Sequence, residues 1–208
     1  MNAEAIRAIL NAAAPRDQRG EIVEAWARES STSAQEVKGP VGRSGTGVSL
    51  AFFTPTQFVF GLTDSKGQRL SEVVNSNHSS YIAVHDVTAR DLLSGDAPRS
   101  LSEVMIRKDV LHLVVPQDND DMLRPRVSTR RMALELTTGF FRIRGGLYRR
   151  DSDPTNLVQL MSGYTRQFIP FADVTIEYLL NSAVRTTGRV ALLNTQHLQY
   201  WAVLPESE

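Results

Sequence analysis

The sequence has no cysteine and no excess of charge of either sign, and both absences limit what the chain can be. Without cysteine in its 208 residues, there is no disulfide, thiolate nucleophile, thiolate-bound metal or iron–sulfur cluster. Basic and acidic residues number 23 each. This balance argues against a protein that coats nucleic acid or an anionic membrane.

Long apolar runs are also missing from the sequence. No stretch approaches the roughly 20 apolar residues that are needed to span a bilayer. The first ten residues, MNAEAIRAIL, lack the pattern of a cleavable signal. We therefore expect a soluble, cytoplasmic protein without a membrane partner.

The N-terminal part of the chain differs in pattern from the rest. Apolar residues recur at helical spacing on both sides of Pro15, which predicts one or two short α-helices within residues 1–30. Such helices either cover a sheet edge or reach a neighbouring subunit. Residues 31–47 are rich in Ser, Thr and Gly and are predicted to be a linker. Their Gly-rich word, Gly42–Gly47, lacks the Lys-Ser/Thr ending of a phosphate loop.

After residue 47 the pattern is that of β-strands. Val48, Leu50 and Phe52 alternate with smaller residues, and Met132 to Leu136 alternate in the same way. A period of two with one polar face is typical of an antiparallel sheet that is half exposed to water. Clusters of turn-forming residues follow at short intervals, so the strands are predicted to be short and close together.

An internal repeat divides this β-rich part in two. When residues 81–115 are shifted by 87 positions, seven residues are identical, among them Asp86 on Asp173 and Leu111 on Leu198. Upstream, a shift of 85 places Gly61-Leu62 on Gly146-Leu147. We expect two modules, at 46–116 and 130–205, joined by a polar linker at 117–129. The repeated Asp86 and Asp173 are predicted to end strands and to accept turn N–H groups.

Each module is expected to hold five strands in about 70 residues. The second strand is predicted at Val73-Val74 in one module and at Leu157-Val158 in the other. So small and bent a sheet avoids free edges by closing on itself. The predicted fold is therefore mainly β, with two tandem five-stranded barrels of the Sm or SH3 kind after the N-terminal helices. A single ten-stranded sandwich is the alternative.

The order of certain short motifs resembles an uncharacterised bacterial domain family. That family has an R-L-S-D/E…N, F…L-x-D, L-V-N-x-x-x-I pattern, and the matching residues here are Gly61-Leu62, Arg69–Glu72, Asn75, Tyr81-Ile82, Asp86 and Leu192–Asn194. The same order is distantly similar to the small barrels of the Sm/LSm family. Ile106–Val110 is similar to the I-R-G-D/N motif of that family, with Lys108 where Gly is usual. The resemblance implies assembly into rings, and binding of single-stranded RNA in some members.

Residues suited to catalysis are few. The four histidines, His78, His85, His112 and His197, lack metal-ligand spacing, and His85 and Asp86 point to opposite faces of a strand. We predict no catalytic residue, no metal and no cofactor. A catalytic or small-ligand role would need a concave pocket with converging polar groups.

A cluster of arginines is the one feature that suggests a partner. Six arginines lie within residues 130–150, and Arg142 and Arg144 share a strand face. Such a face either contacts phosphates, with an aromatic platform for bases, or is simply solvated and deters edge pairing. The candidate contact residues are Arg107, Arg142, Arg144, Tyr148, Arg149 and Arg150.

These observations predict a non-enzymatic structural or interaction protein that forms a homo-oligomer or scaffolds a protein partner. Burial of apolar strand edges between copies would be its mechanism. Binding of RNA or single-stranded nucleic acid through the arginine face is the alternative. It predicts a steep loss of binding with added salt.

Overall fold

Ten β-strands form one open antiparallel sheet in the computed structural model of the chain, which describes residues 47–94, 96–117, 129–150, 153, 156–164 and 166–205. The strands of the first half are β1 (Gly47–Phe53), β2 (Gln57–Asp64), β3 (Tyr81–Asp91), β4 (Arg99–Arg107) and β5 (Leu113–Pro116). Those of the second half are β6 (Thr129–Thr138), β7 (Phe141–Arg150), β8 (Phe168–Tyr178), β9 (Arg185–Asn194) and β10 (Leu198–Val203). The protein is mainly β, as the alternating pattern predicts.

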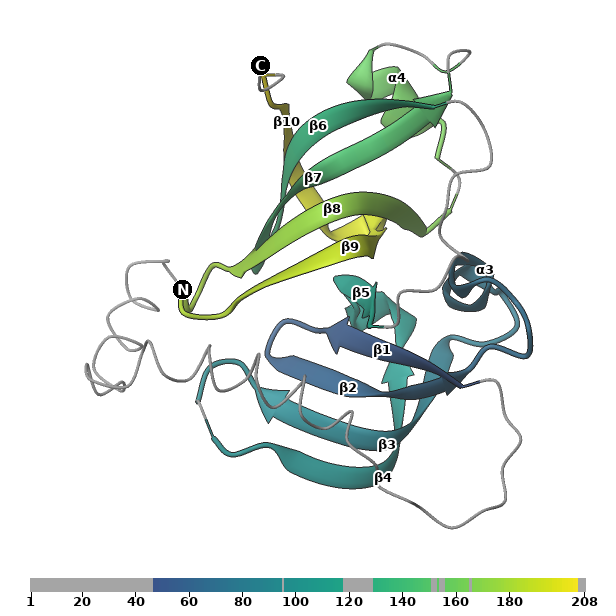
Figure 1. Ribbon diagram of the computed structural model, residues 1–208, viewed down its shortest axis with the longest axis vertical. Helices are drawn as coiled ribbons and strands as arrows, with labels where there is room; N and C mark the ends of the chain where they lie inside the picture. The colour runs from purple at the N-terminus through teal and green to yellow at the C-terminus, as the bar shows by residue number, and fades with distance from the viewer. Residues whose placement is uncertain are drawn as a thin grey trace.

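The prediction of two closed five-stranded barrels is wrong. The strands run in the order β10-β6-β7-β8-β9-β5-β1-β2-β3-β4. Closing two barrels in this order would need β4 to pair with β5, and β9 to pair with β10. Instead β5 lies between β1 and β9, which joins the two halves at the centre of the molecule (Figure 1).

The physical reason lies in the sequences of β5 and β9. Leu113-Val114-Val115 and Ala191-Leu192-Leu193 are continuous apolar runs, and all six residues are buried. A strand that is apolar on both sides needs cover on both faces, which an alternating strand at the surface of a separate small barrel does not have. Two core clusters, each with side chains from both halves of the chain, supply that cover once β5 is paired with β9.

The two halves have the same internal order, β5-β1-β2-β3-β4 and β10-β6-β7-β8-β9. A shift of 87 relates the pairing of β3 with β4 to that of β8 with β9, since Tyr81↔Arg107 corresponds to Phe168↔Asn194. For the first two strands the shift is 84, because Leu50↔Gly61 corresponds to Leu134↔Gly145. The expected shift of 85 is therefore wrong by one residue, and Gly61 is the equivalent of Gly145.

Two short helices replace the strands that were expected at 73–74 and 157–158. They are α3 (Leu70–Asn75) and α4 (Leu157–Ser162), again 87 residues apart. In α3 the buried Leu70 and Val74 are one helical turn apart. Asn156 begins α4 by accepting a hydrogen bond from Val158 N at 2.9 Å. These helix signals were present in the sequence.

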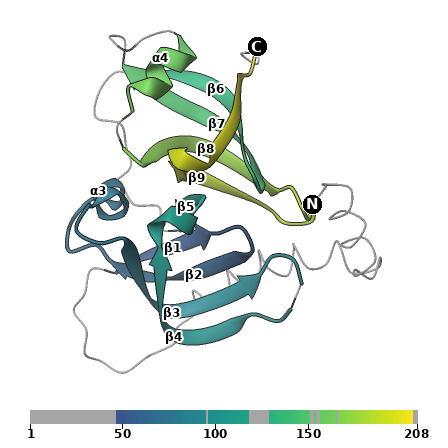
Figure 2. The same ribbon diagram turned by 180° about the vertical axis from the view of Figure 1, so that it is seen from behind.

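The predicted N-terminal helices at 1–30 and most of the predicted linkers at 31–47 and 117–129 lie outside the described residues. Figure 2 shows the described part from behind, with α4 close to β6 and β7, and α3 beside the junction of the two halves. Short 3-10 turns, η2 (Lys108–Val110) and η4 (Thr195–His197), connect the fourth and fifth strands of each half.

Asp86 and Asp173 lie inside β3 and β8, so the prediction that they end strands is wrong. Both have left-handed backbone angles, with φ of 51° and 49°. The strand register shifts beside each of them, between Phe60 and Leu62 and between Arg144 and Gly146. Aspartate tolerates this conformation better than most residues do. Each half therefore bends its third strand at a β-bulge in the same position.

A glycine without room for a side chain faces each bulge. A Cβ on Gly61 would lie 2.6 Å from His85 O, and a Cβ on Gly145 would lie 2.7 Å from Ala172 O. Both oxygens are main-chain atoms of the residue that precedes the bulge aspartate. The close approach of the backbones at the bend therefore requires glycine in both halves.

We expect Gly61→Ala to lower the free energy of unfolding by about 1–3 kcal/mol, because the added methyl group must displace main chain. Chemical denaturation measures the change. Gly47→Ala is the matched control, since its Cβ would be 3.7 Å from the nearest atom, Leu62 Cβ. Equal stability of the two variants would contradict the role assigned to Gly61.

Candidate assembly interface

The contact between β5 and β9, which we call the junction, joins the two halves of the sheet. Leu113 pairs with Leu193 and Val114 with Leu192, and none of the four side chains is exposed. Asn194 N donates to His112 O at 2.9 Å, which continues the ladder by one residue. The strand pairing therefore satisfies backbone groups and buries apolar side chains together.

The two halves share their apolar cores across the junction. Leu192 and Phe168 of the second half pack into the cluster formed by the first half, beside Leu50 and Phe52. In return, Phe53, Leu113 and other residues of the first half pack into the cluster of the second half. Phe53 meets Phe141 there edge-to-face, with ring centroids 5.8 Å apart.

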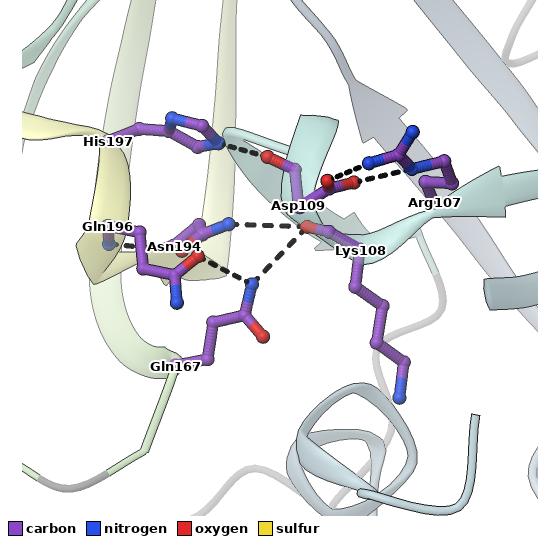
Figure 3. A network of polar contacts seen from close by, with 7 residues as sticks. All are labelled: Arg107, Lys108, Asp109, Gln167, Asn194, Gln196 and His197. Carbon is purple, nitrogen blue, oxygen red and sulfur yellow. Dashed lines mark hydrogen bonds and ion pairs between the residues drawn. The ribbon is translucent and has the colours of Figure 1, made fainter. Parts of the chain in front are cut away.

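Polar side chains bind the carbonyl groups of η2 beside the junction (Figure 3). Asn194 Nδ2 donates to Leu111 O at 2.8 Å and to Lys108 O at 3.3 Å. His197 Nε2 lies 2.6 Å from Asp109 O, so the ring donates its Nε2 proton to that carbonyl. The second half thus supplies hydrogen-bond donors to the carbonyl groups of this turn.

Lys108 is buried on the first-half side of the junction. In Figure 3 its side chain extends toward α3, and Nζ donates to Ser76 O at 2.6 Å. Burial lowers the pKa of this ammonium group. Its contacts therefore connect η2 to the end of α3.

Further polar contacts connect the halves away from the paired strands. Asn75 Nδ2 donates to Phe168 O at 2.9 Å, and Phe168 N donates to Asn75 Oδ1 at 2.8 Å. The amide group of Asn75 thus replaces a strand partner for β8. Tyr178 Oη donates to Pro55 O at 2.9 Å, and burial raises the pKa of this phenol to about 12.

His112 and His197 stack on one another at the junction. Their ring centroids are 4.2 Å apart and the ring planes differ by 14°. The side chain of His112 is buried against Phe140 and Phe141, and its Nδ1 has no hydrogen-bond partner in the structure. Burial, followed by the charge of His197, lowers the pKa of His112 to about 4.

This shift predicts that acid destabilises the fold. In the unfolded chain, His112 takes up a proton near its ordinary pKa of about 6.5, whereas the folded state resists protonation down to about pH 4. Stability is therefore complete above about pH 6.5 and is lost as the pH falls toward 4. We expect His112→Phe to reduce the fall in melting temperature across this window, and thermal denaturation at several pH values measures it.

The exposed His78 provides the control, because His78→Gln should keep the pH dependence of the unaltered chain. An unchanged pH dependence in His112→Phe would show that protonation of His112 does not weaken the junction.

Four of the candidate arginines have a carboxylate or carbonyl oxygen beside the guanidinium group, namely Arg107, Arg142, Arg144 and Arg149. Arg142 Nη1 lies 3.3 Å from Glu177 Oε2, and Arg144 Nε lies 2.7 Å from Glu135 Oε2. Both arginines lie on one face of β7, as predicted. The two glutamates offset the positive charge of that face.

The other candidate contact residues do not all gather with that pair. Arg149 Nη1 lies 3.5 Å from Asp153 O, and Arg150 N donates to Asp153 Oδ2 at 2.6 Å. Tyr148 is exposed on β7. Arg107 is in the other half of the chain, at the end of β4, where it pairs with Asp109.

The outer strands β4 and β10 form the two ends of the sheet and carry large exposed apolar residues. Met105 on β4 is 55% exposed, whereas its equivalent Leu192 is fully buried at the junction. Tyr200 on β10 is 54% exposed, whereas its equivalent Leu113 is fully buried. Met105 and Tyr200 are therefore exposed at the two ends of the sheet, although their equivalents in the repeat are contact residues of the junction.

Sequence reasoning missed the junction, although its signals were present. The unbroken apolar runs of β5 and β9 indicate strands that are covered on both sides. No feature of the sequence indicated the stacking of His112 on His197. The two residues are not equivalent in the repeat, and they come into contact only because the two halves pack together.

Comparison of the chain with protein-family models, with curated proteins and with solved structures gave no match. Within the described ranges, no group of three or more acidic or histidine side chains is arranged to hold a metal ion. No helix in the part of the chain that the structure describes is long and apolar enough to cross a membrane.

Proposed function

We propose that this chain is a non-enzymatic structural protein that works by associating with further copies of itself through the edges of its sheet. The observation that carries the proposal is the exposure of Met105 on β4 and of Tyr200 on β10. An edge strand offers unpaired N–H and C=O groups, so an apolar edge is a template for a further strand.

Of the two edges, β10 differs from edge strands that are protected against pairing, whereas β4 carries Arg99, Glu103 and Arg107. Natural edge strands are blunted by charges, proline or short length. β10 has six residues, Leu198–Val203, and none of them is charged. Val203 is exposed there in addition to Tyr200. Exposed apolar residues at both ends of the sheet favour an interaction with protein.

The arginine face gives less support to a role in binding nucleic acid. Phosphate binding depends on cations whose charge is available to the backbone of the nucleic acid. Glu177 and Glu135 already lie beside Arg142 and Arg144. Self-association is therefore the function that the geometry supports best.

We expect the full chain to have a native mass of at least twice the 23.1 kDa of one copy. Met105→Lys and Tyr200→Lys should each shift it toward the monomer, because a lysine at a paired edge must lose its hydration. Light scattering coupled to size-exclusion chromatography measures the mass over a range of concentrations.

Val158→Lys is the matched control, because Val158 is also largely exposed but lies on α4 and not on an edge strand. It should keep the mass of the unaltered chain. A monomeric unaltered chain at every concentration would contradict the proposed function.

A further inference from the structure

We infer that the copies associate head to tail, with β4 of one copy pairing with β10 of the next in the register of the junction. The inference rests on the proposed function and specifies its interface. Shifting the junction pair Leu113↔Leu193 by 87 residues on one strand, and back by 87 on the other, gives Tyr200↔Ile106. The pair Val114↔Leu192 likewise gives Trp201↔Met105.

The repeat itself provides the first argument. Each half has two outer strands, its fourth and its fifth, and the junction pairs the fifth of the first half with the fourth of the second. The strands that remain at the ends are β4 and β10, which are the fourth of the first half and the fifth of the second. Two copies placed end to end therefore bring together the same kinds of edge that the junction already joins.

Side-chain size provides the second argument, because it is exchanged between equivalent positions. At the junction, Gly188 has no side chain, and a Cβ there would lie 2.9 Å from Val115 Cγ1. The equivalents of these residues are Leu101 on β4 and Ala202 on β10. The larger side chain is therefore on the fifth strand at the junction, as Val115, and would be on the fourth strand between two copies, as Leu101.

Polarity also differs between equivalent pairs, and it changes on both sides of the pair together. At the junction, Phe53 of the first half contacts Phe141 of the second. Their equivalents are Thr137 and Gln57, which would face each other between two copies. Both sides change from apolar to polar together, so neither leaves an apolar ring against a polar group.

Such an interface is heterologous, because it joins two different edges, β4 of one copy and β10 of the next. Repetition of it gives a closed ring when the rotation between copies closes, and a filament otherwise. In an isologous dimer, by contrast, β4 would pair with β4, or β10 with β10.

Mixing two variants of the full chain distinguishes these arrangements. Met105→Lys blocks the β4 edge and leaves β10 intact, whereas Tyr200→Lys blocks β10 and leaves β4 intact. We expect each variant alone to be monomeric and an equimolar mixture to form a dimer, because the intact β10 of one variant meets the intact β4 of the other. The dissociation constant within one variant should exceed that of the mixture roughly tenfold or more.

The outcomes separate this inference from the proposed function. A dimer formed by either variant alone would show isologous pairing, which overturns the inference and leaves self-association standing. An unaltered chain that is monomeric overturns both. Circular dichroism of each variant establishes that it is folded, so that loss of association reports on the edge.

Disulfide trapping tests the register independently, and the absence of native cysteine makes it specific. Because Asn194 N donates to His112 O, the next pair, Leu113↔Leu193, is a non-hydrogen-bonded pair, whose side chains lie closest. Its equivalents are Tyr200 and Ile106. A mixture of Ile106→Cys and Tyr200→Cys should therefore form mixed disulfide dimers on mild oxidation.

Ser102→Cys mixed with Tyr200→Cys is the matched control, because position 102 is four residues along β4 from the expected partner and out of reach of a disulfide. Equal cross-linking by the control would overturn the proposed register. Cross-linking of Ile106→Cys with itself would overturn head-to-tail pairing.

Discussion

The antiparallel pairing of β5 with β9 is the interaction on which the rest of the structure depends. Each half of the chain is a strongly bent five-stranded sheet with two outer strands, and an outer strand leaves main-chain groups without a partner. Pairing one outer strand from each half satisfies those groups and buries Leu113, Val114, Leu192 and Leu193 completely. It also leaves one outer strand of each kind at the ends of the sheet, which is the origin of the proposed assembly.

The bend in each half comes from a device that the chain uses twice. Asp86 and Asp173 adopt left-handed angles at a bulge in the third strand, and a glycine opposite each bulge allows the main chains to approach. Duplication also lets the contacts at the junction and the equivalent contacts at the ends of the sheet change separately. Gly188 against Val115 at the junction and Leu101 and Ala202 at the ends show such a change, since the larger side chain lies on the fifth strand in the first pair and on the fourth strand in the second.

Much of the β architecture could be predicted from sequence, because alternation along β1 and β6 and the 87-residue repeat report local geometry and duplication directly. Whether the barrels close could not be predicted, because closure depends on which outer strands pair. The periodicity within one strand carries no information about the strand beside it. The helices α3 and α4 were missed because a run of six residues holds too few turns for its spacing to be decisive. In α3 the β-branched Val73 and Val74 also favour a strand. The family resemblance and the arginine contacts remain predictions. The ion pairs of Arg142 and Arg144 were beyond prediction, since Glu177 and Glu135 lie on neighbouring strands.

Hydrogen exchange of the main-chain amides of β4 and β10 that point away from β3 and β6 tests the central claim most directly, because these amides are protected only when the edge is paired with another copy. In the unaltered chain at high concentration, we predict protection of both strands. On dilution, protection of these outward-pointing amides of β4 and β10 should be lost together, while the amides of β5 and β9 remain protected. Equally fast exchange of both outer strands at every concentration would show that the ends of the sheet do not pair between copies.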